Sequence, residues 1–159
     1  MKRTVEVSAL GDTVHAFFGS DWPTRAQPER LATATGLLDR YRVSGAIEPT
    51  DLLELADRLW RWVHDQFGNA SVIRTEWPLG LVLDGGTRVL GTSDLVIEAG
   101  SHTAVIDHKS LGLTAAVSKV DILKGQLGCY ADAVARAMPS QTVSTWLHLP
   151  FEGVVVEVT

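Results

Sequence analysis

In the first seventy residues, apolar side chains recur three and four positions apart, which is the period of one face of an α-helix. This pattern predicts a short helix over residues 11–18, a second over 28–42 and a longer third over 49–67. Asp12 or Thr13 is the expected N-cap of the first helix, because a short polar side chain can accept a hydrogen bond from the amide groups of the first turn. The amino-terminal part of the chain is therefore expected to be helical.

After residue 70 the pattern changes to short apolar and β-branched runs separated by turns, which is typical of strands. Strands are predicted over residues 71–77 and 81–84, and again from Arg88 onward. The remaining elements predicted along the chain are a loop over 111–118, a helix over 122–138 stopped by Pro139, and closing strands over 142–149 and 154–158. A helical segment is thus followed by a strand-rich one.

Two apolar runs within the strand-rich segment, residues 94–97 and 103–106, flank a short turn at residues 100–101. Runs of this kind around a glycine-containing turn predict an antiparallel hairpin. If the two turn residues form the loop, counting back along both strands places Asp94 opposite Asp107. This register decides which polar side chains meet.

Three charged side chains are expected on one face of this hairpin. Because side chains alternate along a strand, Lys109 shares the face of Asp94 and Asp107, whereas His108 points the other way. Like charges repel at the ~5 Å separation of opposed Cβ atoms, so a cation is expected between the carboxylates. A hard divalent ion such as Mg²⁺ prefers these oxygen ligands. The alternative is a carboxylate and lysine network on a solvated sheet face, and the hairpin pattern alone does not separate the two interpretations.

The composition and net charge exclude several kinds of site and protein. At 159 residues and 45% hydrophobic, the chain is long enough to form one domain with its own core. Its single cysteine, Cys129, excludes a disulfide within the chain and any four-cysteine metal site built from this chain alone. The net charge of −5 argues against a general nucleic-acid binder, which would present a basic patch. An acidic domain that processes DNA would rely on a partner domain to hold its substrate.

The amino terminus has basic residues but no long apolar segment behind them. Neither a signal peptide nor a membrane span is therefore expected, and the default location is the cytoplasm.

Four further polar side chains have an ordinary structural interpretation beside a functional one. His15 borders an apolar helical stripe, where a packed histidine is commoner than a ligand. Glu76 precedes Pro78 near the end of its predicted strand; it could join the carboxylate group, but a surface salt bridge is its simpler interpretation. Gln126 and Tyr130 are four residues apart and share a helix face, as a core tyrosine and a polar neighbour would.

The order of elements and four short motifs resemble the PD-(D/E)XK nuclease superfamily. The motifs are His15 at a helix start, Gly91-Thr92-Ser93-Asp94, Asp107-His108-Lys109 and Gln126-Leu127-Gly128-Cys129-Tyr130. They are similar to the successive motifs of RecB-like nuclease domains, most closely the carboxy-terminal nuclease domain of AddA-type helicase-nucleases, and they cover nearly the whole chain. Ser93 stands where the superfamily name has a proline, but the RecB-like branch uses Gly-x-x-Asp there.

The resemblance implies an α/β fold with a restriction-endonuclease-like core, in which helices flank a central mixed β-sheet and an extra helical segment precedes it. It also implies a single nuclease domain over residues 1–159. That domain would be mainly helical over 1–70, would carry the sheet core and one helix over 71–159, and would be part of a longer helicase-nuclease chain.

The resemblance further implies a metal site. Its ligands would be His15, Asp94, Asp107 and the backbone carbonyl of His108, and Lys109 would be the catalytic lysine. The implied cofactor is Mg²⁺, for which Mn²⁺ can substitute.

Two more side chains are implied at the border of that site. Gln126 and Tyr130 would orient the catalytic lysine or the DNA backbone.

The function implied by the resemblance is that of a metal-dependent DNA nuclease, the exonuclease module of an ATP-dependent helicase-nuclease in double-strand break processing and recombinational repair. The implied partners are DNA with single-stranded ends, the helicase domains of the same polypeptide and a second helicase-nuclease subunit. No association with a membrane is implied. Two alternatives remain: a non-catalytic nuclease-like module that binds DNA or docks, and a restriction-type endonuclease. No extra recognition insertion in the sequence supports the restriction-type enzyme.

Overall fold

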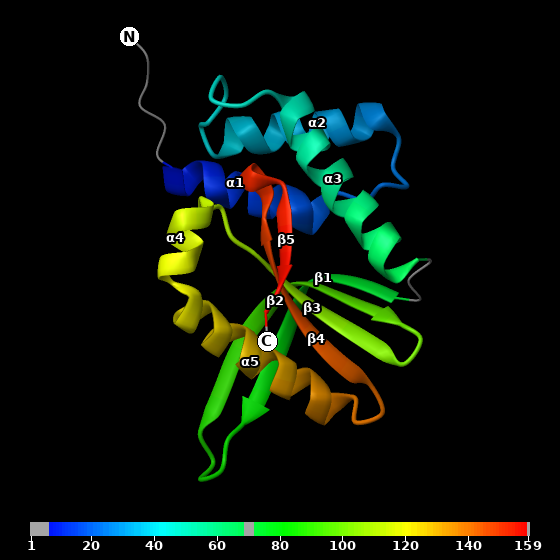
Figure 1. The fold of residues 1–159 in the computed structure, drawn as a ribbon. Coiled ribbons are helices and arrows are strands. Elements are labelled where there is room, and N and C mark those ends of the chain that lie inside the picture. Colours follow the sequence, from blue (N-terminus) through cyan, green and yellow to red (C-terminus); the bar gives the residue numbers. More distant parts are fainter. Residues whose placement is uncertain (1–6, 69–71, 159) are drawn as a thin grey trace. The chain divides into compact units, whose positions relative to one another are not determined.

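The described residues of the computed structural model are 7–68 and 72–158, and they fall into two compact units, one within residues 1–65 and one within residues 66–159 (Figure 1). The first unit is helical and the second contains a β-sheet. The boundary lies close to the change of pattern that the sequence shows near residue 70. The predicted start of a strand at residue 71 lies outside the described residues.

The described part of the helical unit has three α-helices, as the apolar spacing predicts. They are α1 (Val7–Ser20), α2 (Gln27–Arg40) and α3 (Pro49–Phe67), and α3 continues two residues into the second unit. The N-cap prediction for the first helix is wrong, because α1 starts before Gly11 and encloses both Asp12 and Thr13. Thr13 Oγ1 donates to the carbonyl oxygen of Ala9 at 2.7 Å, a bond made in the interior of a helix rather than at its cap.

Each of these helices buries its apolar stripe. The side chains of the helical unit that are at most 3% exposed include Val14, Phe17, Phe18, Ala34, Leu38, Leu52, Leu59 and Val63. Trp22 and Trp60 stack with ring centroids 5.9 Å apart, which ties the end of α1 to α3. Among the described residues, no helix combines the length and the apolar composition needed to cross a lipid bilayer.

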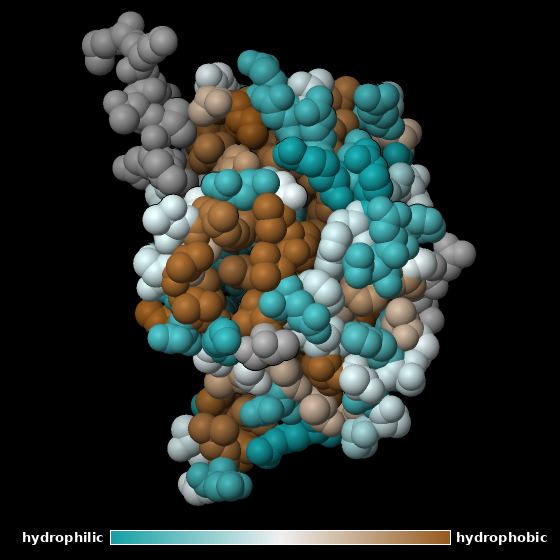
Figure 2. Space-filling view, viewed as in Figure 1, coloured by the Kyte–Doolittle hydropathy of each residue, from teal (hydrophilic) through white to brown (hydrophobic). Residues whose placement is uncertain are grey.

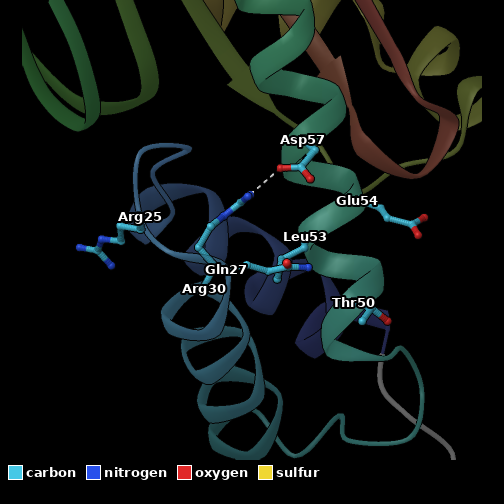
Figure 3. Close-up of a pocket in the computed structure, with 7 residues that line it drawn as sticks. All are labelled: Arg25, Gln27, Arg30, Thr50, Leu53, Glu54 and Asp57. Carbon is cyan, nitrogen blue, oxygen red and sulfur yellow. Dashed lines mark hydrogen bonds and ion pairs between the residues drawn. The ribbon is translucent and has the colours of Figure 1, made fainter.

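A buried ion pair crosses the helical unit. Arg30 on α2 binds Asp21 through two hydrogen bonds of 2.8 Å each, and its Nη2 also lies 2.7 Å from Asp57 Oδ1 on α3. The hydrogen bonds to Asp21 raise the pKa of Arg30 above its ordinary value, although burial acts in the opposite direction. Arg30 and Asp57 line a hollow of about 400 Å³. Figure 3 shows Arg30 reaching toward Asp57, while Arg25 points away.

The second unit is built on a mixed sheet. Its described strands are β1 (Val72–Val82), β2 (Arg88–Ala99), β3 (His102–His108), β4 (Thr142–Leu149) and β5 (Val154–Glu157), in that spatial order. β3 and β4 are parallel and the other neighbours are antiparallel. A parallel pair needs a crossover connection, which α4 (Leu113–Ser118) and α5 (Val120–Ala137) provide.

Helix α5 lies across the sheet and closes its core (Figure 1). Leu127 and Val134 of α5 pack in one buried cluster with Leu79 and Leu81 of β1 and with Val105 of β3. This packing fixes α5 against the strands that carry the hairpin carboxylates. The face of α5 that borders the hairpin therefore has a defined position.

Two predictions about the strand-rich segment are wrong in detail. The strands predicted over 71–77 and 81–84 are one continuous strand, β1, in which Pro78 pairs with Thr92. A proline is tolerated because β1 is the edge strand of the sheet and its missing N–H can face outward. The predicted loop over 111–118 contains α4, whose Ala116 packs against the sheet.

Removing the buried guanidinium should destabilise the helical unit. Arg30→Ala leaves the Asp21 carboxylate, which is 1% exposed, buried without its cation, and should lower the free energy of unfolding by about 3 kcal/mol. Asp57→Ala is the matched control, because that side chain is 49% exposed and should cost less than about 1 kcal/mol. Urea unfolding followed by circular dichroism measures both. Equal losses of unfolding free energy in the two variants would contradict the role of Arg30 as the cation that compensates buried Asp21.

Candidate metal centre

The β2–β3 hairpin has the register that the sequence predicts. Ala99 pairs with His102, and the ladder continues to the pair Leu95 and Ile106. Gly100 in the turn has a φ of 62°, the left-handed conformation that glycine adopts without strain. One step beyond the last ladder pair lie the two aspartates.

Asp94 is held by the opposite strand. The residue is only 6% exposed, and its Oδ2 accepts a hydrogen bond of 2.6 Å from the backbone N–H of His108. This bond ties the middle of β2 to the end of β3, because it reaches across the hairpin one residue beyond Asp107. It also orients the carboxylate, since one of its two oxygens is fixed by the backbone.

Asp107 is paired with the lysine that follows it on the same face. Its carboxylate is 2% exposed, and its Oδ2 lies 2.6 Å from Lys109 Nζ. Gln126 Nε2 donates to the other oxygen, Oδ1, at 3.3 Å. A buried carboxylate requires a cation or hydrogen bonds in compensation, and Lys109 and Gln126 supply both here. The predicted grouping of Asp107 with Lys109 is therefore present in the structure.

Gln126 and Tyr130 of α5 lie beside Asp107 and contact each other; their spacing predicts the shared helix face, and only the motif resemblance implies their place beside the site. Gln126 Nε2 lies 3.0 Å from the Tyr130 hydroxyl. The Tyr130 ring lies so close to β2 that a Cβ added at Gly91 would come within 2.7 Å of it. Gly91 is thus the residue that lets the ring approach the sheet.

A third carboxylate lies beside Asp94. Glu76 has a φ of 50°, which non-glycine residues rarely adopt, and it lies within β1 at the position opposite Asp94. One carboxylate oxygen of each residue lies within 4.8 Å of the other. A rare backbone conformation of this kind costs about 1–3 kcal/mol and is commonly found at functional sites. The sequence favours a surface salt bridge for Glu76. The signal for its position beside Asp94 is the register of β1 and β2, which puts the two residues opposite each other.

The strand β4 supports the segment that carries these groups. His108 pairs with His148 across the parallel ladder, and their Nδ1 atoms lie 3.0 Å apart with both side chains buried. One of the two Nδ1 atoms must carry the hydrogen. The backbone N–H of Lys109 donates to the carbonyl oxygen of His148 at 2.9 Å. The sequence does not single out His148, because its contact depends on a pairing between strands forty residues apart.

A family model described as the PD-(D/E)XK nuclease superfamily matches residues 2–157 of the chain. The chain belongs to this superfamily. The mixed sheet of five described strands, with its helices, is consistent with a restriction-endonuclease-like PD-(D/E)XK fold, so the predicted fold class is confirmed. The finer placement with the RecB-like or AddA-type domains remains a prediction.

Comparison with curated proteins gives no match. Among solved structures, the one described as "Crystal structure of SSO0001" is 15% identical, with a TM-score of 0.35. The alignment covers 96% of this chain and 65% of that chain, so the chain spans less than two thirds of the length of that structure.

Nucleases of the PD-(D/E)XK superfamily generally use divalent metal ions. Glu76 and Asp94 fit such an ion, because each offers a hard carboxylate oxygen and these oxygens lie within 4.8 Å of each other. Asp107 follows Ile106, the partner of Leu95 in the β2–β3 ladder, and offers a further carboxylate on the next strand. His15 lies on α1 in the helical unit, and its role as a further ligand remains a prediction. The same holds for the backbone carbonyl of His108.

The close approach of Tyr130 to Gly91 can be tested by adding one methyl group. Gly91→Ala should push the ring away and lower the free energy of unfolding by about 1–3 kcal/mol, the usual cost of overpacking. Gly80→Ala is the control, because its Cβ would meet only Leu90 Cδ2 at 3.4 Å. Thermal unfolding compares the two variants. If Gly91→Ala unfolds at the wild-type temperature, the ring does not occupy this position.

Proposed function

We propose that this chain is a metal-dependent DNA nuclease domain that hydrolyses phosphodiester bonds. The observation that carries the proposal is the pairing of buried Asp107 with Lys109, next to buried Asp94 on the adjoining strand, in a chain of a nuclease superfamily. A purely structural sheet has little reason to bury two carboxylates on neighbouring strands, because burial of charge is unfavourable. A hydrolytic site that uses a metal ion needs such carboxylates to bind the ion.

The residues proposed to hold the ion are Asp94 and Asp107, with Glu76 beside Asp94 and with His15 and the His108 carbonyl implied by the motif resemblance. The proposed ion is Mg²⁺, replaceable by Mn²⁺. When bound, such an ion lowers the pKa of a coordinated water and stabilises negative charge on a phosphate.

The proposed roles of the remaining groups follow from their contacts. Lys109 is 27% exposed at its side chain, so its ammonium group can reach both Asp107 and a substrate phosphate. There it would position the attacking water and offset the negative charge that develops during in-line displacement. Gln126 keeps Asp107 oriented through Oδ1, and Tyr130 in turn orients Gln126.

We further propose that the domain is the exonuclease module of an ATP-dependent helicase-nuclease that acts in double-strand break processing. The order of the four motifs and the Gly-x-x-Asp form at Asp94 support this placement. The net charge of −5 is in keeping with it, because a domain this acidic gains from helicase domains of the same polypeptide or from a second subunit that hold the DNA.

Two substitutions test the nuclease assignment. Asp107→Asn and Lys109→Ala should each lower Mg²⁺-dependent cleavage of single-stranded DNA by roughly 1000-fold, because the first removes a proposed ligand of the ion and the second removes the ammonium group proposed to act on the phosphate. Asp132→Asn, on an exposed position of the same α5, should cut like wild type. Release of labelled nucleotides measures the cleavage rate of all three variants, and circular dichroism checks that each variant is folded.

Undiminished cutting by folded Asp107→Asn or Lys109→Ala would refute the assignment. A wild-type chain that binds DNA but cuts none with Mg²⁺ or Mn²⁺ would instead support the non-catalytic module.

A further inference from the structure

Two histidines are buried side by side on the face of the sheet opposite Asp107. His108, the last residue of β3, is 5% exposed, and His148 of β4 is 3% exposed. Their rings are T-shaped, with centroids 4.9 Å apart and with the two Nδ1 atoms 3.0 Å apart. The two residues are partners in the parallel ladder, and side chains alternate along β3, so both rings lie on the face away from Asp107.

Burial in this unit does not follow hydrophobicity alone. Leu113 and Val117 of α4 are 51% and 65% exposed, and Figure 2 shows an apolar surface, coloured brown, over the region where Figure 1 draws this helix. The two histidines are buried although they are polar. Two buried polar groups that bond each other contribute about as much stability as two apolar groups of the same shape. The contact between the imidazoles is therefore better explained by the position that it imposes than by stability.

One histidine of the pair belongs to the segment that carries the candidate metal centre. The backbone N–H of His108 donates to Asp94 Oδ2 at 2.6 Å. Its two neighbours in the chain are Asp107 and Lys109, which pair with each other. A change in φ or ψ of His108 would therefore move the hydrogen-bond donor of Asp94 and alter the direction in which Lys109 leaves the strand.

His148 holds this segment through two of its groups. Its carbonyl oxygen accepts a hydrogen bond of 2.9 Å from the backbone N–H of Lys109, a contact that any residue at 148 can make. Its Nδ1 contacts Nδ1 of His108, a contact that depends on the side chain. Because one of these nitrogens must donate and the other accept, the contact fixes the direction of the His108 ring and the tautomers of both rings.

We propose that the side chain of His148 is a positioning residue of the metal centre, acting through the ring of His108. By fixing that ring it fixes the backbone of residues 107–109, which carries Asp107 and donates the hydrogen bond to Asp94. This inference rests on the proposed nuclease function and adds to it a residue of β4 that touches neither the ion nor the substrate. Groups that orient the ligands of a metal ion from outside typically contribute roughly 10- to 100-fold in metal affinity.

The other end of the same two strands offers a matched control. His102 Nε2 lies 2.7 Å from Ser144 Oγ, so a second histidine of β3 contacts β4 through its ring. His102 lies next to the hairpin turn, on the same face as His108 but far along the strand from the two aspartates. General loosening of β3 from β4 would follow from breaking either contact, whereas the proposed positioning role belongs to His148 alone.

Binding of Mn²⁺ tests the proposal without any cleavage. His148→Gln moves the polar group away from the place of Nδ1 and should raise the Kd for Mn²⁺ roughly tenfold, as measured by isothermal titration calorimetry. His148→Asn places an amide group where Nδ1 lies and should restore most of the affinity. Ser144→Ala, which removes the hydroxyl that His102 contacts, should bind Mn²⁺ like wild type.

Folding and positioning are separated by the conditions of the measurement. Urea unfolding of the metal-free variants gives their stabilities, and the titrations are made where every variant is fully folded. A purely structural loss then leaves the Kd for Mn²⁺ unchanged. If His148→Gln does not fold, the same comparison of Asn with Gln is made at His108, whose Nδ1 is the other half of the contact.

Cleavage of single-stranded DNA gives a second readout. At saturating Mn²⁺, His148→Gln should lower kcat roughly tenfold and leave KM for the DNA close to that of wild type, because the histidine pair is buried and does not touch the strand. His148→Asn should recover most of the lost kcat.

The positioning role and the nuclease function fail by different results. Unchanged Mn²⁺ affinity in folded His148→Gln, an equal loss in His148→Asn, or the same loss in Ser144→Ala would overturn the positioning role even if wild type cuts DNA. A wild type that binds Mn²⁺ and cuts no DNA, with roughly tenfold weaker binding in His148→Gln, would refute the nuclease function and leave the positioning role standing.

Discussion

The register of the β2–β3 hairpin is the constraint on which the candidate site depends. Because side chains alternate along a strand, a slip of one residue would turn Asp94 away from the face of Asp107 and Lys109. The register is fixed at both ends. The tight turn holds one end, and the bond between Asp94 Oδ2 and the His108 N–H holds the other. Pairing of His108 with His148 then ties β3 to β4 and completes the frame.

That frame concentrates negative charge where water is excluded. Asp94 and Asp107 are both less than one tenth exposed, and burial of a carboxylate is unfavourable without a partner. In the structure the backbone of His108 compensates the first, and Lys109 and Gln126 compensate the second. A divalent ion can replace part of this compensation, which would free the lysine for the substrate. The arrangement therefore serves both stability and the proposed chemistry.

Local patterns predict the elements whose partners are close in sequence. The hairpin register, the bounds of α3 and the i, i+4 pair of Gln126 and Tyr130 all follow from spacing within one or two elements. Features that depend on distant segments could not be predicted in this way. The contact of Gly91 with Tyr130 requires α5 to pack on β2, and the backbone of Glu76 turns left-handed only in the context of its neighbouring strand.

The central claim is that Asp94 and Asp107 enclose a divalent cation. Anomalous diffraction from a crystal soaked in Mn²⁺ tests it most directly, because the signal locates the ion without assumptions about activity. The account predicts a peak at bonding distance from both carboxylates, about 2.0–2.6 Å, with an imidazole nitrogen of His15 in its coordination shell. A folded chain that shows no peak there, or a peak bound only by other residues, would contradict it.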